Sequence, residues 1–251
     1  MSSNTRPERS MRAPPLPLVR PDSHSAIMIE RLLQHTLTLS EAHSSVFFWV
    51  GPDAEWIEVQ SANVCVSHVD AYLQSVGRRD PLNIKRLRDQ GRRIAALRQE
   101  QKLDPGAVDA DYAAYLCSID VGDEIDLVFW REDRPFACLG LMRTRQQPPF
   151  LLDGFDWDGL RNFIEATLHL HWRTRAMLVE DHLVRRVGLK PRELDVVRHV
   201  VMGKDNSQIA ASLGITVGTV KTHVVSVLDK MGVDSRLAIA CFVHDLRTRL
   251  N

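Results

Sequence analysis

Apolar residues recur at helical spacing in several stretches of the chain. Residues 27–39 predict an amphipathic helix, and residues 69–76 predict a second one that ends before Asp80-Pro81. Residues 84–102 are strongly basic with interspersed apolar positions, which predicts a helix with a solvated face. A further i, i+3, i+4, i+7 pattern predicts a helix that runs on toward Val187 as a connector. Its stripe consists of Leu160, Phe163, Ile164, Thr167, Leu168 and His171.

Strand-forming residues gather in two pairs of segments. Residues 45–50 and the segment around Glu55–Gln60 flank Gly51-Pro52-Asp53-Ala54, which predicts a β-hairpin. Residues 123–133 and 134–144 are two longer β-rich runs that meet at a tight turn, and they predict a second hairpin. Helices that flank a sheet built from hairpins predict an α+β sandwich for the N-terminal domain.

Two short helices and a glycine turn precede a longer helix in the last quarter of the chain. The first helix opens with Pro191, whose missing N–H costs nothing in a first turn, and ends at Gly203. Asp205 caps the second helix, with Gln208 three residues on as the other half of a capping box. Gly214 ends it, because a left-handed residue closes a helix C-terminus. Short helix, turn and longer helix in this register predict a helix-turn-helix rather than a plain helical bundle.

The longer helix, capped by Thr216, has two different faces. A helix that is buried on one side and small, polar and basic on the other can enter the major groove of DNA. The apolar stripe is Val220, Val224, Val227, Leu228 and Met231, and the opposite face carries Gly218, Thr222, Val225 and Asp229, with Lys221 and His223 on the flanks.

This segment resembles the LuxR-type DNA-binding domain. The resemblance rests on RE at 192–193, Gly203, IA at 209–210, LGI at 213–215, TVKTH at 219–223, KMGV at 230–233 and Arg236. It implies an all-α four-helix domain over residues 188–251, whose fourth helix, from Ser235 onward, often makes dimer contacts. It also implies that Lys221, Thr222 and Val225 face bases, and that Asn206, Thr216 and Thr219 lie near phosphates.

Two residues depart from the family pattern. Lys190 replaces the usual Thr cap before Pro191, which weakens the start of the first helix by about 1 kcal/mol. Val225 stands where relatives often have a polar or basic residue, and its methyl groups suit contact with the methyl of thymine. The base preferences of the family are therefore not transferred to this chain.

The N-terminal domain resembles GAF-like effector domains and the autoinducer-binding domains of quorum-sensing regulators, with which it shares its order of elements. The resemblance implies a sensor that takes a small molecule into a mostly apolar pocket. Our candidate lining residues are Trp49, Trp56, Tyr72, Tyr112 and Tyr115. The fixed Trp, Tyr and Asp spacing of autoinducer-binding domains is not found, so an acyl-homoserine lactone is one candidate among several.

Charge is divided unevenly although the whole chain has a net charge of zero. Residues 185–251 contain 11 Lys and Arg against six Asp and Glu, a net charge of +5, and residues 1–184 therefore carry −5. A basic module on an acidic body is typical of a nucleic-acid-binding domain joined to another domain. We expect a tail at 1–22, a sensor domain at 23–175, a connector at 176–187 and the DNA-binding domain at 188–251.

Other classes of protein find less support. The four cysteines, Cys65, Cys117, Cys138 and Cys241, form no CxxC pair, so buried thiols in a reducing cytosol are expected rather than a metal site or disulfides. The chain has no nucleophile elbow, metal cluster or phosphate loop, so neither an enzyme nor a cofactor is expected. A response-regulator receiver would need an acidic pair, a phosphoacceptor Asp and a parallel βα sheet. The sequence instead predicts strands in hairpins and shows no acidic pair at the start of the domain, so a receiver is not favoured.

The sequence therefore predicts a one-component transcriptional regulator in the cytoplasm. Its expected partners are double-stranded promoter DNA, a second copy of the chain, a small-molecule effector and, if it activates, RNA polymerase, with no membrane. The dimer is expected to use the Leu160 stripe and the fourth helix around Leu237, Ile239 and Ala240. The charged sequence of residues 172–188 suggests a movable, solvent-exposed strut. The alternatives are an orphan regulator whose N-terminal domain only dimerises, and control by phosphorylation.

Overall fold

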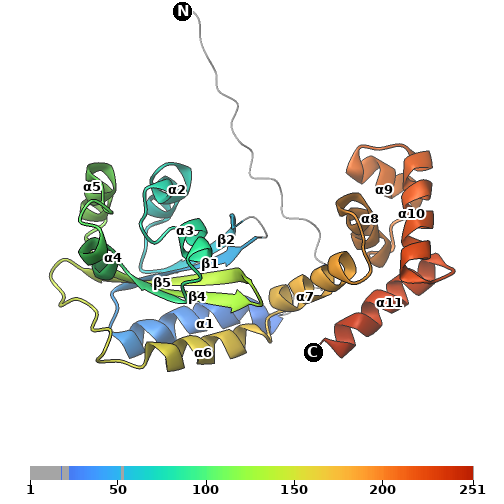
Figure 1. The fold of residues 1–251 in the computed structure, drawn as a ribbon. Coiled ribbons are helices and arrows are strands. Elements are labelled where there is room, and N and C mark those ends of the chain that lie inside the picture. Colours follow the sequence, from blue (N-terminus) through green and yellow to red (C-terminus); the bar gives the residue numbers. More distant parts are fainter. Residues whose placement is uncertain (1–17, 19–22, 52–53, 251) are drawn as a thin grey trace, which may run out of the picture. The chain divides into compact units, whose positions relative to one another are not determined.

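The computed structural model describes residue 18, residues 23–51 and residues 54–250 (Figure 1). The tail expected at residues 1–22 lies outside these residues, apart from Leu18. The described chain forms two compact units, which we call the sheet unit, residues 23–51 and 54–174, and the helical unit, residues 175–250 together with Leu18. Each unit is considered by itself.

The sheet unit is built on a five-stranded sheet in the order β2-β1-β5-β4-β3. All of its neighbouring strands pair antiparallel, and the two hairpins predicted from the sequence are confirmed. An antiparallel sheet is not the parallel βα sheet that a receiver domain requires. The strands are β1 (Ser44–Val50), β2 (Trp56–Ala62), β3 (Ile94–Ala96), β4 (Val121–Arg131) and β5 (Arg134–Thr144).

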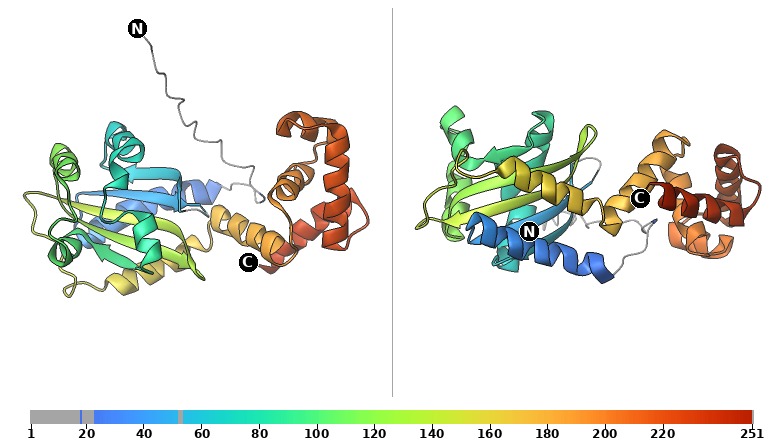
Figure 2. Two further views of the ribbon diagram at one scale, coloured as in Figure 1. Left: turned by 45° about the horizontal axis from the view of Figure 1, so that its top comes forward. Right: turned by 90° about the horizontal axis from the view of Figure 1, so that it is seen from below.

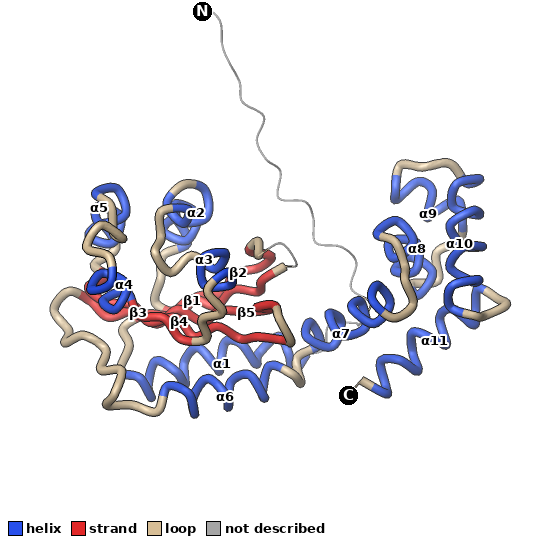
Figure 3. Tube along the Cα trace, viewed as in Figure 1, coloured by secondary structure: helices blue, strands red, loops and turns tan. Residues whose placement is uncertain are grey.

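Helices cover both faces of this sheet (Figures 1 and 3). Two long helices lie side by side on one face, and four shorter ones cover the other (Figure 2). The first pair is α1 (Ser23–Ser40) and α6 (Trp157–Leu168); the others are α2 (Val66–Gln74), α3 (Ile84–Asp89), α4 (Leu97–Leu103) and α5 (Ala110–Ser118). The predicted α+β sandwich is confirmed.

Burial on both faces explains why the central strands are apolar throughout. Every residue of β1 is buried, and successive side chains point to opposite faces. Phe48 therefore belongs to the core under α2–α5, whereas Phe47 and Trp49 point to the face covered by α1 and α6. The ring of Phe47 meets that of Trp49 edge-to-face, with 5.1 Å between ring centroids, and lies 6.5 Å from the ring of Phe129 on β4.

The basic stretch at residues 84–102 is not a single solvated helix as predicted. It holds α3, the short strand β3 and α4, and it buries Ile84, Leu87 and Leu97. Gly91, at φ +64°, follows the end of α3. Ala95 then pairs with Asp126 of β4, so a long-range strand pairing replaces the helix that the local pattern favoured.

The helix expected to continue toward Val187 is interrupted after α6. Residues 169–171 separate α6 from α7 (Trp172–Arg185). The solvent-exposed strut predicted for residues 172–188 is also wrong, because Ala176, Val179 and Leu183 of α7 are buried. Arg198 of the next helix lies 2.9 Å from the carboxylate of Glu180 and joins it to α7.

The helical unit continues with four more helices, α8 (Pro191–Val201), α9 (Asn206–Leu213), α10 (Val217–Met231) and α11 (Arg236–Arg249). The predicted all-α four-helix domain is confirmed. Helix α10 contacts each of the other three, and its buried residues meet those of α8, α9 and α11 in one core. Gly214 and Gly232 follow α9 and α10 at φ +65°, where a residue without a side chain is favoured.

Candidate nucleic-acid interface and ligand face

Helix α10 has the two faces that its sequence predicts. Val220, Val227 and Met231 are buried against the other helices of the unit, and Val224 and Leu228 are half-buried. The opposite residues Gly218, Thr222, Val225 and Asp229 are all exposed. Val225 is an aliphatic side chain with 63% of its surface in solvent.

The first turn of α10 gathers hydroxyl groups. Thr216 is the N-cap: its Oγ1 accepts the N–H of Thr219 at 3.1 Å, as predicted, and the two hydroxyls lie 2.8 Å apart. Lys221 follows on the same exposed half of the helix and has no ion-pair partner among the described residues. A helix N-terminus with exposed hydroxyls and a lysine offers hydrogen-bond donors and positive charge to a phosphate group.

Helix α9 is fixed at both ends by the residues that the sequence indicated. The N–H of Gln208 donates to Asp205 Oδ1 at 2.8 Å, and the N–H of Asp205 donates to Gln208 Oε1 at 2.9 Å, which confirms the capping box. At its other end Gly214 leads into α10, and the bend between the two helices is 108°. That angle is typical of a helix-turn-helix.

Asn206 opens α9 and is held from α11. Arg236 donates to Asn206 Oδ1 at 3.1 Å and also to the carbonyl oxygen of Lys204. The arginine therefore ties the start of α11 to the start of α9 and fixes the orientation of Asn206. The six residues expected at the DNA surface come from two adjacent segments, the first residue of α9 and the first half of α10 with its cap.

Glu193 joins α8 to the back of α10, a role that the sequence alone did not indicate. Its Oε2 accepts the N–H of Lys190 at 2.7 Å and the ammonium of Lys230 at 2.6 Å, and its Oε1 accepts the hydroxyl of Ser226 at 2.7 Å. Burial alone would raise the pKa of Glu193, but these three donors outweigh it and lower the pKa to about 2. The Glu193 carboxylate also caps α8, which has no side-chain cap from Lys190.

These helices match a known family. The model for the bacterial regulatory proteins of the luxR family matches residues 188–243, which include α8, α9, α10 and the first half of α11. The C-terminal domain belongs to the luxR family. The resemblance drawn from the sequence motifs is thus confirmed for this domain.

Relatives of the LuxR-type domain include a response regulator and a transcriptional regulatory protein. The chain is 44% identical over 59 residues to the nitrate/nitrite response regulator protein NarL of Escherichia coli (strain K12), which covers 24% of this chain and 27% of NarL. It is 39% identical over 57 residues to the transcriptional regulatory protein LiaR of Bacillus subtilis (strain 168), which covers 23% of this chain and 27% of LiaR. The chain thus spans about a quarter of the length of these relatives.

Two solved structures resemble longer parts of the chain at low sequence identity. Escherichia coli SdiA is 17% identical, with 90% of this chain and 91% of SdiA covered and a TM-score of 0.41. A GAF domain/HD domain protein from Geobacter sulfurreducens is 14% identical, with 61% of this chain and 94% of that chain covered and a TM-score of 0.44. Likeness at this level does not identify a ligand for the sheet unit.

Three of the five candidate ligand residues of the sheet unit lie together. Tyr72 on α2 and Tyr112 and Tyr115 on α5 belong to the α2–α5 side of the sheet, where the rings of Tyr72 and Tyr115 are 6.3 Å apart and those of Tyr112 and Tyr115 are 6.2 Å apart. The ring of Phe48 lies 6.1 Å from Tyr72. The hydroxyl of Tyr72 donates to Asp80 Oδ2 at 2.5 Å.

The other two candidates are not part of this cluster. Trp49 points to the opposite face of the sheet, because neighbouring residues of a strand alternate in direction. Its ring lies 4.7 Å from that of His171, and the guanidinium of Arg173 lies 5.6 Å from the Trp49 ring centre. Trp56 begins β2, but its side chain lies outside the described part of the chain. A single pocket bordered by all five residues is therefore not formed.

Carboxyl groups that the sequence analysis missed lie on the same side as the three tyrosines. Burial raises the pKa of Glu124 and Asp126 well above the usual value, and the negative charge of Asp80 raises both further. Burial also raises the pKa of Asp80, against the opposing effect of the Tyr72 hydroxyl. The alternation of β4 could have revealed this cluster, since Glu124 and Asp126 share a face with the buried Val128.

Other chemistry on the described residues is limited. Cys65, Cys117 and Cys241 are exposed and only Cys138 is buried, which corrects the expectation of buried thiols. Among the described residues, no group of three His, Cys, Asp or Glu side chains is arranged to hold a metal ion. No single described helix is long and apolar enough to cross a membrane; α9 and α10 reach that length and composition only as a pair bent by 108°.

Proposed function

We propose that this protein is a sequence-specific DNA-binding transcriptional regulator, acting in the cytoplasm. The observation that carries the proposal is the exposed face of α10 within a LuxR-type domain. Thr222 and Val225 would contact base edges in the major groove, and Lys221 would reach a base or a phosphate beside them. Asn206, Thr216 and Thr219, at the starts of α9 and α10, would position the domain on the sugar-phosphate backbone.

Binding to DNA selected from a random pool tests this proposal. Full-length protein is used for repeated rounds of selection, and the enriched sequence is then titrated by fluorescence anisotropy at several salt concentrations. Lys221→Ala should weaken binding by about 1–3 kcal/mol if Lys221 reads a base, and should lower the salt slope by about one if it meets a phosphate. Lys102→Ala, a change at an exposed lysine of the sheet unit, is the control.

Two outcomes would contradict the DNA-binding proposal. One is that no sequence is enriched over the starting pool. The other is that Lys221→Ala and Lys102→Ala bind the enriched sequence with the same affinity and the same salt slope as the unchanged protein.

We further propose that the sheet unit senses a small molecule on its α2–α5 side. The cluster of Tyr72, Tyr112 and Tyr115 beside Asp80 supports this, because aromatic rings with a few polar groups are typical of small-molecule sites. An effector would change operator affinity only by the difference in its own affinity for the two states of the protein, commonly about 1–3 kcal/mol. RNA polymerase would be a partner if the bound regulator activates.

Mass spectrometry of the protein under native conditions and after denaturation tests the sensor proposal. A small molecule that leaves on denaturation, and that is absent from protein carrying Tyr112→Trp, supports it. The alternative of an orphan regulator would be favoured if no small molecule is released and if no compound in a metabolite library changes the melting temperature. We also propose that the protein binds DNA as a two-fold symmetric dimer, because one small domain alone buries too little surface for tight operator binding.

A further inference from the structure

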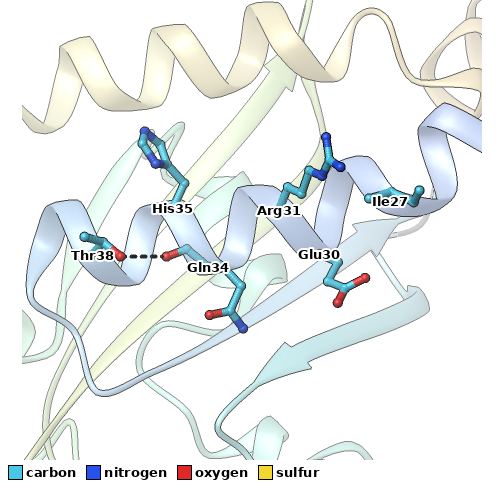
Figure 4. A pocket seen from close by; sticks show the side chains of 6 residues that line it. All are labelled: Ile27, Glu30, Arg31, Gln34, His35 and Thr38. Carbon is cyan, nitrogen blue, oxygen red and sulfur yellow. Dashed lines mark hydrogen bonds between the residues drawn. The ribbon is translucent and has the colours of Figure 1, made fainter.

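The side chains around the pocket on the outer surface of α1 diverge. The pocket has a volume of about 390 Å³ and is lined by Ile27, Glu30, Arg31, Gln34, His35 and Thr38. All of these residues belong to one helix, and Figure 4 shows that Arg31 and His35 leave it toward α6 whereas Glu30 points away. On α6, the side chains of Leu160, Ile164 and Leu168, expected at a dimer interface, are buried inside the sheet unit. Polar groups converge instead on the α2–α5 side of the sheet.

Three carboxyl groups meet on the α2–α5 side. Glu124 and Asp126 leave the same face of β4, because side chains two residues apart on a strand point the same way. Gly140 of β5 pairs with Asp126, and a Cβ atom at Gly140 would lie 3.0 Å from Asp126 Oδ1 and 3.3 Å from Glu124 Oε1. Both carboxyls therefore lean over the point where β5 has no side chain. Asp80 is the third, and its charge raises the pKa of the other two.

These carboxyls have no cationic partner in the described part of the chain. Asp126 is only 7% exposed; its Oδ2 accepts the weak thiol donor of Cys138 at 3.6 Å, and its Oδ1 accepts no hydrogen bond from a described residue. Asp80 is 4% exposed, and neither it nor Glu124 forms an ion pair with a described residue. Buried charges in proteins are normally paired, and a buried acceptor without a donor calls for a partner from outside the chain.

Tyrosine side chains lie beside the carboxyls. The hydroxyl of Tyr72 donates to Asp80 Oδ2 at 2.5 Å, and the hydroxyl of Tyr112 interacts with both Asp80 and Glu124. The ring of Tyr115 lies 6.3 Å from that of Tyr72 and 6.2 Å from that of Tyr112. Because the face of an aromatic ring attracts a positive charge, rings and carboxyls favour the same kind of ligand.

The chemistry of these groups selects a primary ammonium ion. An ammonium group has three N–H donors, which match three carboxyl groups. An anion would be repelled by the carboxyls, and a wholly apolar molecule would leave them buried without a partner. A metal ion is poorly matched, because no group of three His, Cys, Asp or Glu side chains among the described residues is arranged to hold one.

We infer that the α2–α5 side of the sheet unit binds a small organic molecule through a primary ammonium group. Asp80, Glu124 and Asp126 accept the N–H bonds of the ammonium group, and the rings of Tyr72 and Tyr115 contact the carbon skeleton. This inference rests on the proposed sensor function and names the chemical class of its effector.

Binding of such a cation releases protons from the protein. Burial raises the pKa of Glu124 and Asp126 in the free protein, whereas an ammonium ion favours their ionised forms. An alkylammonium ion stays charged below about pH 10, so its affinity rises with pH as the carboxyls lose their protons. The other titratable and charged groups that interact with these carboxyls are Asp123 on β4, Cys138 on β5, Tyr72 on α2, Tyr112 and Tyr115 on α5, and Arg86 on α3. Burial raises the pKa of the tyrosines and of Cys138, so these groups stay neutral between pH 6 and pH 8.

Isothermal titration calorimetry of the full-length protein with butylammonium chloride tests the inference. Two matched probes separate the parts of the ligand: 1-butanol has the same carbon chain without the charge, and tetramethylammonium has the charge without an N–H group. Butylammonium should bind at least about 10-fold tighter than either probe, as loss of one charge-assisted interaction predicts. Its affinity should also be higher at pH 8 than at pH 6, with protons released to the buffer on binding.

Substitution of single carboxyls locates the ammonium group. Asp126→Asn and Glu124→Gln should each weaken butylammonium binding at least about 10-fold. Asp70→Asn is the matched control, because Asp70 is an exposed carboxylate on α2 and should leave the affinity unchanged. Far-UV circular dichroism and urea unfolding verify that each variant is folded, so that lost binding is not mistaken for lost structure.

Three results would overturn the inference. Butylammonium could bind no tighter than 1-butanol, Asp126→Asn could bind it as tightly as Asp70→Asn does, or the affinity could be the same at pH 6 and pH 8. Native mass spectrometry separates this inference from the sensor proposal. A released molecule with a primary amine supports both, and one without a basic nitrogen overturns the ammonium inference while the sensor proposal stands.

Discussion

Replacing Glu193 with Gln removes the charge that joins α8 to the back of α10. In the folded protein the carboxylate accepts bonds from Lys190, Ser226 and Lys230, and its pKa falls from 4.5 to about 2. A carboxyl held in this way stabilises the folded state by about 3 kcal/mol at pH 7. Because the folded pKa lies below the unfolded one, this stabilisation is complete above pH 4.5 and is lost as the pH falls toward 2.

Hydrogen exchange followed by mass spectrometry measures this effect within the helical unit. At pH 7, Glu193→Gln should lower the free energy of opening of α8 and α10 by about 2–3 kcal/mol, which corresponds to exchange about 100-fold faster. At pH 3 the difference from the unchanged protein should shrink to less than about half of that value, after correction for intrinsic exchange rates. Asp229→Asn, at an exposed carboxylate of α10, is the control.

The reasoning about Glu193 would be refuted by either of two results. Peptides from α8 and α10 could exchange at the same rate in the variant and the unchanged protein at pH 7. Alternatively, the loss of protection could be as large at pH 3 as at pH 7, which would show that shape rather than charge holds the two helices together.

Two further predictions concern stability. Asp126→Asn should stabilise the sheet unit above neutral pH and flatten the pH dependence of its stability. Burial raises the pKa of Asp126 in the folded protein, so this carboxyl favours the folded state below its unfolded pKa and costs stability as the pH rises through the folded pKa. Tryptophan fluorescence during urea unfolding measures this effect, and a variant that loses stability equally at pH 5 and pH 8 would contradict it. Gly214→Ala should lower the free energy of unfolding by about 1–2 kcal/mol, because the φ of +65° at Gly214 is strained for any residue with a side chain. Gly218→Ala inside α10 should instead raise the free energy of unfolding by up to about 1 kcal/mol. Thermal unfolding followed by circular dichroism compares the two variants, and equal effects would contradict the backbone argument.

Features of the helical unit that depend on neighbouring residues were predicted well from the sequence. The caps Asp205 and Thr216 act within three residues along the chain, and both form as expected. The burial of Val220, Val227 and Met231 follows from helical periodicity alone. The DNA-facing residues came instead from the family resemblance, and their contacts with DNA stay predictions.

Features of the sheet unit that depend on distant residues were predicted less well. The strand at Ile94–Ala96 forms because it pairs with β4, about 30 residues later in the chain. The basic sequence around it contains no local pattern that predicts a strand. The prediction placed Trp49 with the tyrosines and overlooked the alternation of side chains along a strand. Trp49 follows Phe48 directly and therefore points to the opposite face, together with Phe47. The inward direction of Glu124 and Asp126 breaks the rule that cores are apolar, and such departures are expected at functional or strained positions.

The two faces of α10 have a consequence for how such a regulator changes over generations. Thr222 and Val225 project outward from a helix whose anchoring residues, Val220, Val227 and Met231, point the other way. Exposed positions usually tolerate replacement within about 0.5 kcal/mol of folding free energy. A lineage can therefore exchange the outward residues, and with them the set of promoters it controls, while the domain itself stays equally foldable.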